Sequence, residues 1–244
     1  MPDTVNELLR SYRYFRGLGY VKIAFVPADP CYWTEESVRR FESAFGEVAD
    51  AYIDDMRRGY FIDLKYVTEW HHAKRDNVEI KTRSCGAGRG MVLIDIKGSI
   101  FPCHRWNKQD EGSWRLGNIY SSDFNDDVRE RFFRSRKEAR EQMGCQDCEA
   151  SPVCGFGCPA ENLETTKDMW IRHQIGCELQ RAMARVAAKA HETLAAERNT
   201  QFEKHYVSEG IVGRQRDSKR KETVRHPTAR LANSVCVVYA SCLK

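Results

Sequence analysis

The chain has 244 residues, which is enough for one sizeable domain or two small ones with a buried core. Its net charge of +4 is modest for this length and does not by itself indicate a nucleic-acid partner. No apolar run approaches the length of a membrane span, and the N-terminal stretch has no apolar segment of the signal-peptide kind. We therefore expect a cytoplasmic protein without a membrane partner, in which clustered thiols favour metal binding over disulfides.

Residues 1–80 have the pattern of an α/β fragment. A helical rhythm over 4–17 ends at two glycines, a short strand follows at 21–26, and Thr34 is placed to cap the next helix. We expect further helices over 35–45, 47–58 and 60–74. This fragment is too small to close a barrel on its own.

A β-hairpin is predicted from Met91 onward. One apolar run leads to a turn at Gly98, which supplies the positive φ that such a turn requires, and a second run ends near Cys103. The hairpin therefore returns Cys103 toward Cys85. The sequence GAGRG at 86–90 is similar to a phosphate-binding loop, but it lacks a preceding strand and a GK[ST] ending, so we interpret it as a flexible rim.

Three helical segments are predicted in the second half, over about 125–141, directly after Cys158, and from Cys177 to about Tyr206. Their inward residues are expected to be Val128, Phe132 and Phe133 in the first helix, and Leu179, Met183, Val186, Ala190, Leu194 and Phe202 in the last. From Ser208 the chain is basic and poor in large apolar residues, so we expect disorder and no nucleic-acid binding. The final apolar residues could form an edge strand.

Cysteines are the most informative residues of the chain. Seven of the ten fall in one region, namely Cys85, Cys103, Cys145, Cys148, Cys154, Cys158 and Cys177. The middle four are so close in sequence that they leave no room for a hydrophobic core between them, and the glycines and prolines among them force a loop that folds back on itself. A disulfide knot, a tetrahedral zinc or an iron–sulfur cluster could organise such a loop. Spacing alone does not separate iron–sulfur from zinc, for which His104 or His173 could complete a second site.

Order and spacing of these cysteines follow the pattern Cys-x9–15-Gly-x4-Cys, Cys-x2-Cys-x5-Cys-x3-Cys and a final Cys. This pattern resembles the SPASM domain, the C-terminal extension of many radical S-adenosylmethionine (radical SAM) enzymes. The resemblance covers about 85–177, and the phrases GMVLIDIKGSIFPCHRW, LGNIY and CPAENLETT support it. It implies an α+β fold in which a C-terminal remnant of a partial (β/α)6 barrel precedes the SPASM domain with its β-hairpin and helices. The implied parts are the barrel remnant and linker at 1–80, the SPASM-like domain at 81–180, a C-terminal helix at 181–206 and the tail at 207–244.

The resemblance also implies two auxiliary [4Fe–4S] clusters. Carried over by position, an inner cluster would be held by Cys85, Cys103 and Cys158, and an outer one by Cys145, Cys148, Cys154 and Cys177. Fully ligated relatives have one more cysteine shortly before the first, whereas this chain reads EIKTRS there and Cys31 is remote in sequence. The fourth inner ligand is therefore remote, not a cysteine, or replaced by an open iron position. Cys236 and Cys242 lie outside the motif.

One candidate catalytic residue follows from the same comparison. Sulfatase-maturing relatives carry an aspartate directly after the second motif cysteine, where this chain has His104. Imidazole can act as a base near neutral pH, so we name His104 as the candidate. Asp95 and Arg105, near the same hairpin, are expected to be structural or to face the substrate.

The resemblance implies a peptide or protein maturase, but the Cys-x3-Cys-x2-Cys loop that cleaves S-adenosylmethionine does not occur in this sequence. We therefore expect the C-terminal portion of such an enzyme, as a fragment or as half of a split system. S-adenosylmethionine would then bind only to a missing barrel or to a separate barrel subunit, and the substrate would be a peptide or protein. The alternatives are a zinc-stabilised interaction module and a stand-alone electron-transfer protein.

Overall fold

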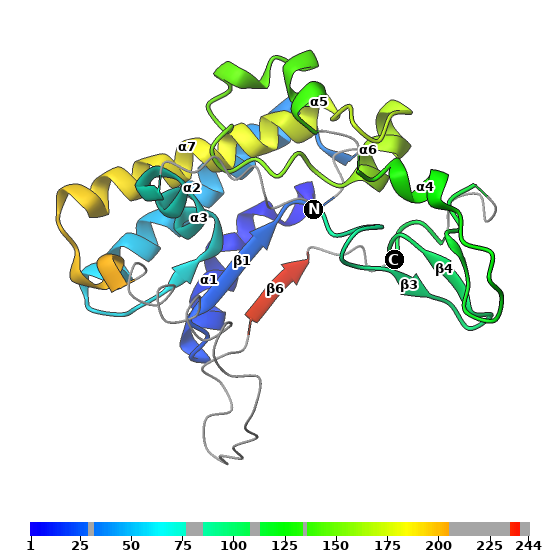
Figure 1. Cartoon of the computed structure of the whole chain (residues 1–244). Helices are drawn as coiled ribbons and strands as arrows, with labels where there is room; N and C mark the ends of the chain where they lie inside the picture. The colour runs from blue at the N-terminus through cyan, green and yellow to red at the C-terminus, as the bar shows by residue number, and fades with distance from the viewer. Residues whose placement is uncertain (29–31, 77–84, 108–112, 134–135, 205–234, 240–244) are drawn as a thin grey trace, which may run out of the picture. The chain divides into compact units, whose positions relative to one another are not determined.

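A computed structural model of the chain describes residues 1–28, 32–76, 85–107, 113–133, 136–204 and 235–239. It mixes helices and strands, which confirms the predicted α+β class, and it divides into two compact units (Figure 1). Unit 1 comprises Met1–Ile80, Glu149–Cys154 and Gln174–Lys244. Unit 2 comprises Lys81–Cys148 and Gly155–His173. The barrel remnant remains a prediction.

Unit 1 packs helices against a parallel sheet with the strand order β2-β1-β6. Its elements are η1 (Pro2–Glu7), α1 (Leu8–Gly17), β1 (Lys22–Val26), α2 (Glu35–Arg57), β2 (Asp63–Leu64), α3 (Lys65–Asp76), α7 (Gln174–Ala196) and β6 (Val235–Tyr239). Lys22 of β1 lies opposite Asp63 on one side and Val235 on the other. Helix α2 therefore forms the crossover that two parallel strands require.

Helix α2 begins where the sequence predicts but is not interrupted. The Thr34 side chain accepts the Ser37 N–H at 3.2 Å, and the Ser37 hydroxyl accepts the Thr34 N–H at 2.8 Å, so the two form a reciprocal cap. We predicted two helices, over 35–45 and 47–58, with a break at Gly46. The structure has one helix over Glu35–Arg57, because burial of its apolar face outweighs the cost of about 1 kcal/mol for an internal glycine.

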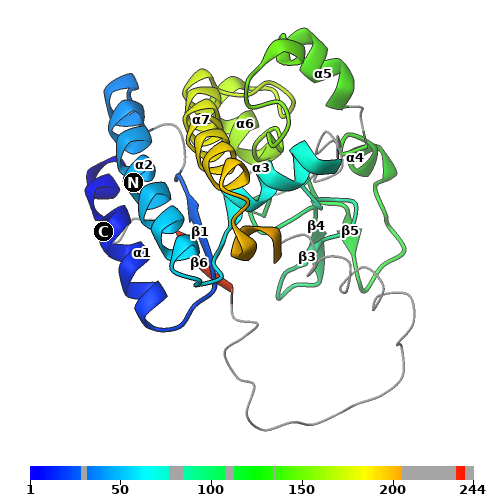
Figure 2. The same cartoon turned by 90° about the vertical axis from the view of Figure 1, so that its left-hand side faces the viewer.

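Helices α2 and α7 lie side by side in the core of unit 1 (Figure 2). Helix α7 buries the residues predicted to face inward, Leu179, Met183, Val186, Ala190 and Leu194. It ends at Ala196 rather than near Tyr206, because the positive φ of 49° at Arg198 ends the helical path. Phe202 is also buried, but it follows this break and packs on His71 with ring centroids 4.0 Å apart.

One helix boundary differs from the predicted one. The predicted helix over 60–74 is the short strand β2 followed by α3, because two residues pair with β1 before the helix starts. Residues 149–154 and 174–180 belong to unit 1, where α7 is one continuous helix from Gln174.

The predicted tail over 207–244 contains one described segment. Residues 235–239 form β6 at the edge of the sheet, which agrees with the edge strand considered for the final apolar residues, and Cys236 lies opposite Ile23 of β1. The remainder of the tail, including Cys242, lies outside the described residues, as does Cys31.

A histidine pair joins α3 to α7. The Nδ1 atoms of His71 and His191 are 2.9 Å apart, so one ring donates a hydrogen bond and the other accepts it. Burial lowers the pKa of His191, and Lys74 lowers it further while Glu192 opposes the shift. The unfolded chain therefore takes up a proton at His191 before the folded chain does. Stability due to this group is present above the unfolded pKa of about 6.5 and is lost as the pH falls below it.

We expect the urea midpoint of unfolding to fall between about pH 7 and about pH 5, and to fall less in His191→Gln. A single group can change the free energy of unfolding by at most about 1.4 kcal/mol per pH unit. The exposed His104 provides the control, because His104→Gln should keep the wild-type slope. Equal slopes in wild type and His191→Gln would contradict this account of the pair.

Unit 2 contains an antiparallel sheet with the order β3-β4-β5 and several short helices. Its elements are β3 (Leu93–Ile94), β4 (Ser99–Phe101), β5 (Gly117–Asn118), α4 (Asp126–Glu130), α5 (Arg136–Gln142), η3 (Cys145–Asp147) and α6 (Pro159–Thr166). Strands β3 and β4 are the predicted hairpin, with Gly98 at a φ of 78° in the turn. Asp95 Oδ1 accepts the N–H groups of Lys97 and Ser99, so Asp95 is structural.

The GAGRG sequence forms a hydrogen-bonded turn. The carbonyl of Gly86 accepts the N–H groups of Arg89, Gly90 and Met91, and the Gly88 N–H donates to the carbonyls of Met91 and Pro102. These N–H groups bond to carbonyls of unit 2, whereas a phosphate-binding loop directs its N–H groups at the ligand.

The predicted helix over 125–141 is two helices, α4 and α5. Asn125 caps α4 by accepting the Val128 N–H at 3.1 Å, but the helix ends at Glu130. Val128 and Phe132 are buried as predicted, whereas Phe133 is 49% exposed. The prediction fails for Phe133 because the helical period does not continue past the end of α4.

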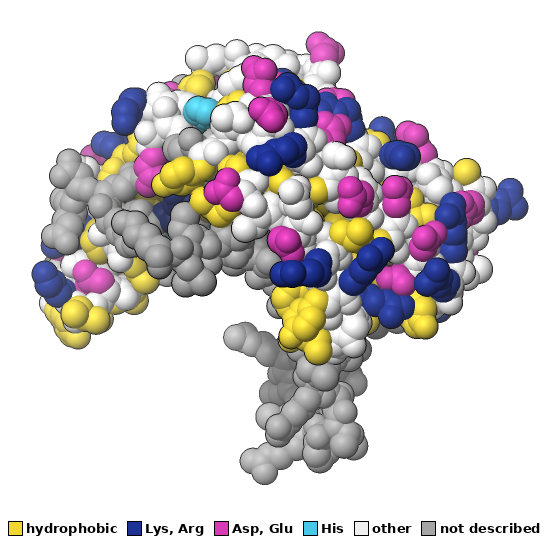
Figure 3. All heavy atoms as spheres, turned by 180° about the vertical axis from the view of Figure 1, so that it is seen from behind, with side chains coloured by type: hydrophobic (Ala, Val, Ile, Leu, Met, Phe, Trp, Pro, Cys, Tyr) yellow, Lys and Arg dark blue, Asp and Glu magenta, His cyan; other side chains and the backbone are white. Residues whose placement is uncertain are grey.

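The described residues contain no helix that is long and apolar enough to cross a membrane. Positive and negative side chains alternate over the face seen in Figure 3, without a large area of one sign.

Candidate metal centre

All seven motif cysteines are described, and the structure holds them as thiols. The predicted inner set, Cys85, Cys103 and Cys158, lies entirely within unit 2. The predicted outer set is distributed differently. Cys145 and Cys148 belong to unit 2, at η3, and Cys154 and Cys177 belong to unit 1.

Cys103 follows β4 and is 4% exposed. Its Sγ accepts the backbone N–H of Arg105 at 3.4 Å, and the Trp106 N–H also interacts with it. Burial raises the pKa of the Cys103 thiol, the two N–H groups oppose the shift, and the sulfurs of Cys158 and Cys85 raise the pKa further. All three cysteines belong to unit 2, where Cys103 is part of the buried core and Cys85 and Cys158 pack against it.

Cys158 occupies the N-cap of α6. Its backbone is extended, with φ −95° and ψ 123°, and Pro159 follows at the first helical position, where no N–H is needed. Burial raises the pKa of the Cys158 thiol, and Cys85 adds to the increase. The N–H groups of Glu161 and Ala160 and the Arg105 guanidinium act in the opposite direction, because they stabilise negative charge on sulfur.

The thiols of the inner set lie in or against the apolar core of unit 2. Trp106 and Leu116 are fully buried in it, and the Trp106 ring packs against Trp114 and Phe132 at centroid distances of 4.3 Å and 5.2 Å. Cys85, Cys145 and Cys158 are partly buried against the same core. An apolar surrounding controls solvent access and reduction potential at metal sites.

The two residues after Cys103, His104 and Arg105, differ in their exposure and their contacts. Arg105 extends to α6, where its Nη2 is 2.9 Å from a Glu164 carboxylate oxygen and its Nη1 is 3.8 Å from one of Glu161. His104, the candidate catalytic residue, is exposed. Sequence reasoning named Arg105 but missed its partners, because the only available signal was its position near Cys103.

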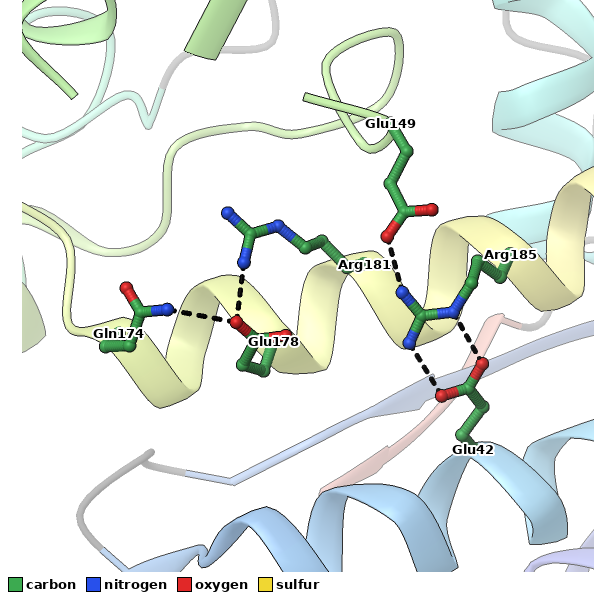
Figure 4. Close-up of polar contacts among 6 residues, drawn as sticks. All are labelled: Glu42, Glu149, Gln174, Glu178, Arg181 and Arg185. Atoms are coloured by element: carbon green, nitrogen blue, oxygen red, sulfur yellow. Dashed lines mark hydrogen bonds and ion pairs between the residues drawn. The ribbon is translucent and has the colours of Figure 1, made fainter. Parts of the chain in front are cut away.

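In unit 1, one arginine connects the segment that carries Cys154 to the helix that carries Cys177. Arg185 of α7 binds Glu42 of α2 through two 2.7 Å hydrogen bonds and binds Glu149 through its third nitrogen (Figure 4). Because Glu149 begins the segment that ends at Cys154, this contact fixes the segment on α7.

Cys177 itself lies in the first turns of α7. Its neighbour Glu178 accepts hydrogen bonds from Gln174 at 3.0 Å and from Arg181 at 2.5 Å (Figure 4). These contacts keep the start of the helix ordered around the cysteine.

Across the described ranges, no three His, Cys, Asp or Glu side chains are gathered closely enough to hold a metal ion as they stand. The chemistry of the inner donor set nevertheless fits a thiolate-bound group. It offers the sulfurs of Cys85, Cys103 and Cys158, N–H donors to two of them, and an apolar enclosure. Zinc accepts the same donors, so the choice of metal depends on the family.

A comparison with protein families supplies that information. Residues 85–149 match the model of SPASM, an iron-sulfur cluster-binding domain. The match includes Cys85, Cys103, Cys145 and Cys148, and it confirms the resemblance predicted from the cysteine spacing. No curated protein matches the chain.

Proposed function

Because the chain carries a SPASM domain, which binds iron–sulfur clusters, we propose that it holds two auxiliary [4Fe–4S] clusters. Cys85, Cys103 and Cys158 hold the inner cluster, and the other four motif cysteines hold the outer one. The observation that carries the proposal is the match of residues 85–149 to the SPASM domain, together with the backbone N–H of Arg105, which donates to Cys103 Sγ at 3.4 Å. Hydrogen bonds of this type to thiolate sulfur are a principal means by which proteins tune such clusters.

The wider role that we propose is the SPASM portion of a radical SAM enzyme that modifies a peptide or protein side chain. When bound, the auxiliary clusters supply a site that accepts an electron or anchors the substrate. The chain's own residues hold the sulfurs, exclude water through Trp106 and its apolar neighbours, and provide His104 at the surface as the candidate base. S-adenosylmethionine binds to a barrel that carries the Cys-x3-Cys-x2-Cys loop, in the same polypeptide or in a separate subunit. A cytoplasmic location belongs to this proposal, because reduced thiols persist in that compartment.

The test is metal analysis of the chain after anaerobic purification and reconstitution with iron and sulfide. We expect about eight irons and about eight sulfides per chain, since each [4Fe–4S] cluster contains four of each. Absorption and EPR spectra of the reduced protein should show two cluster signals. Stoichiometric zinc without stable iron would reject the proposal and indicate a zinc-stabilised module.

A second measurement separates the maturase role from that of a free electron carrier. The loaded chain is mixed with a barrel subunit that carries the missing loop and with a candidate peptide, and peptide modification is followed by mass spectrometry. Modification that depends on the chain and on direct association with the barrel supports the maturase. Electron delivery that a small ferredoxin replaces equally well supports the carrier.

A further inference from the structure

We propose that Arg105 positions the two halves of the inner cluster site, which are the segment after β4 that carries Cys103 and the start of α6 that carries Cys158. We also propose that Arg105 raises the reduction potential of the cluster bound there. The inference rests on the proposed function, because it concerns the same site. Arg105 is not a ligand in this proposal. It acts on the sulfurs of Cys103 and Cys158 through its backbone and its side chain.

The geometry gives Arg105 one contact on each half of the site. Its backbone N–H donates to Cys103 Sγ at 3.4 Å, directly after β4. Its guanidinium binds Glu164 at 2.9 Å and lies 3.8 Å from Glu161, both on α6, the helix that Cys158 caps. One residue therefore fixes the end of the hairpin and the start of α6 with respect to each other.

The guanidinium also places a positive charge at the helix that a ligand cysteine caps. A guanidinium stays protonated in proteins, so Arg105 carries a fixed positive charge where it pairs with Glu161 and Glu164 of α6, and Cys158 is the N-cap of that helix. Reduction of a cluster adds a negative charge, which a fixed positive charge nearby stabilises relative to the oxidised state.

Stability alone is a weak explanation for this arrangement. The side chains of Arg105 and Glu164 are 33% and 40% exposed, and ion pairs with such exposure contribute little to folding. Their position between two ligand-bearing segments gives the pair a different effect. Without Arg105, the carboxylates of Glu161 and Glu164 would lose the cation that pairs with them on the helix that Cys158 caps, and reduction of the cluster would become harder.

The experiment compares Arg105→Gln, Arg105→Lys and Glu164→Gln in the reconstituted full chain. Arg115→Gln is the matched control, since Arg115 pairs with Asp123 in the same unit and is similarly exposed. Iron content and the midpoint potential of each cluster are measured, the latter by redox titration monitored by EPR. The inner signal is assigned as the one that Cys103→Ser abolishes.

We expect a more negative inner potential in Arg105→Gln, together with faster loss of iron to a chelator. Arg105→Lys should stay close to the wild-type potential because it keeps the charge, and Glu164→Gln should shift the potential in the positive direction. Arg115→Gln should change neither potential. An unchanged inner potential in Arg105→Gln, with wild type and variant both fully loaded, overturns the inference alone. A wild-type chain that binds no iron overturns the proposed function itself.

Discussion

Replacement of Cys103 by serine is expected to remove one cluster and leave the other, so bound iron should fall from about eight to about four per chain. Cys103 is the most buried thiol of the inner set and interacts with the sulfurs of both Cys85 and Cys158. A serine oxygen is a poor ligand for iron in place of a thiolate, and its shorter bond to carbon leaves a gap in a tightly packed site. Cys145→Ser should remove the other cluster and leave the inner one.

The control for these variants is a cysteine outside the motif. Cys236→Ser should retain the full iron content, because Cys236 belongs to neither proposed ligand set. Iron and sulfide analysis, with EPR spectra of the reduced protein, distinguishes the three variants. Full iron retention in Cys103→Ser would remove this residue from the ligand set, and complete loss of iron would show that the clusters do not form independently.

Local features of the fold were predictable from neighbouring residues. The Thr34 cap, the turn at Gly98 and the helix after Cys158 depend on side chains or backbone angles within a few positions, and the structure confirms each of them. Predictions failed where tertiary packing determines the length of a helix or the exposure of a side chain. Gly46 does not interrupt α2, and Phe133 is exposed beyond the end of α4, because tertiary burial sets where these helices continue or stop.

In the metal centre, too, local sequence features were predictable and features set by tertiary packing were not. The spacing of the cysteines identified the SPASM domain, because its ligand pattern is defined by the numbers of residues between the cysteines. The partners of Arg105 were not predictable, because Glu164 lies 59 positions further along the chain and meets Arg105 only when α6 packs near the end of β4. The assignment of Cys154 and Cys177 to a unit other than that of Cys145 likewise depends on the packing of α7.

A buried carboxylate fixes α1 on α2 in unit 1. Asp55 accepts a hydrogen bond from the Tyr12 hydroxyl at 3.0 Å and from Arg16 Nε at 3.1 Å, and a second Arg16 nitrogen is 3.0 Å from its other oxygen. Tyr12 is 1% exposed. Burial raises the pKa of the Tyr12 hydroxyl, and the negative charge of Asp55 raises it further, so Tyr12 remains a neutral donor. The Arg16 guanidinium also stacks over the Tyr60 ring at 4.0 Å.

We expect Asp55→Ala to lower the free energy of unfolding by about 2–4 kcal/mol, because the buried Tyr12 hydroxyl loses its acceptor and Arg16 loses its counter-ion. Asp55→Asn should cost less, about 1–2 kcal/mol, since the amide oxygen still accepts one hydrogen bond. The control is Asp54→Ala on the same helix, where an exposed pair with Arg57 is removed and little change is expected. Urea unfolding followed by far-UV circular dichroism measures all three.

A double-mutant cycle with Tyr12→Phe then separates the hydrogen bond from general packing. Once Tyr12 has no hydroxyl, Asp55→Ala no longer leaves a buried donor without an acceptor, so its cost should fall by about 1 kcal/mol or more. Additive costs would show that Tyr12 and Asp55 act independently, in spite of the 3.0 Å separation between their oxygens. Because domains are stable by only about 5–15 kcal/mol, loss of this network would consume a large part of the stability that keeps α1 in place.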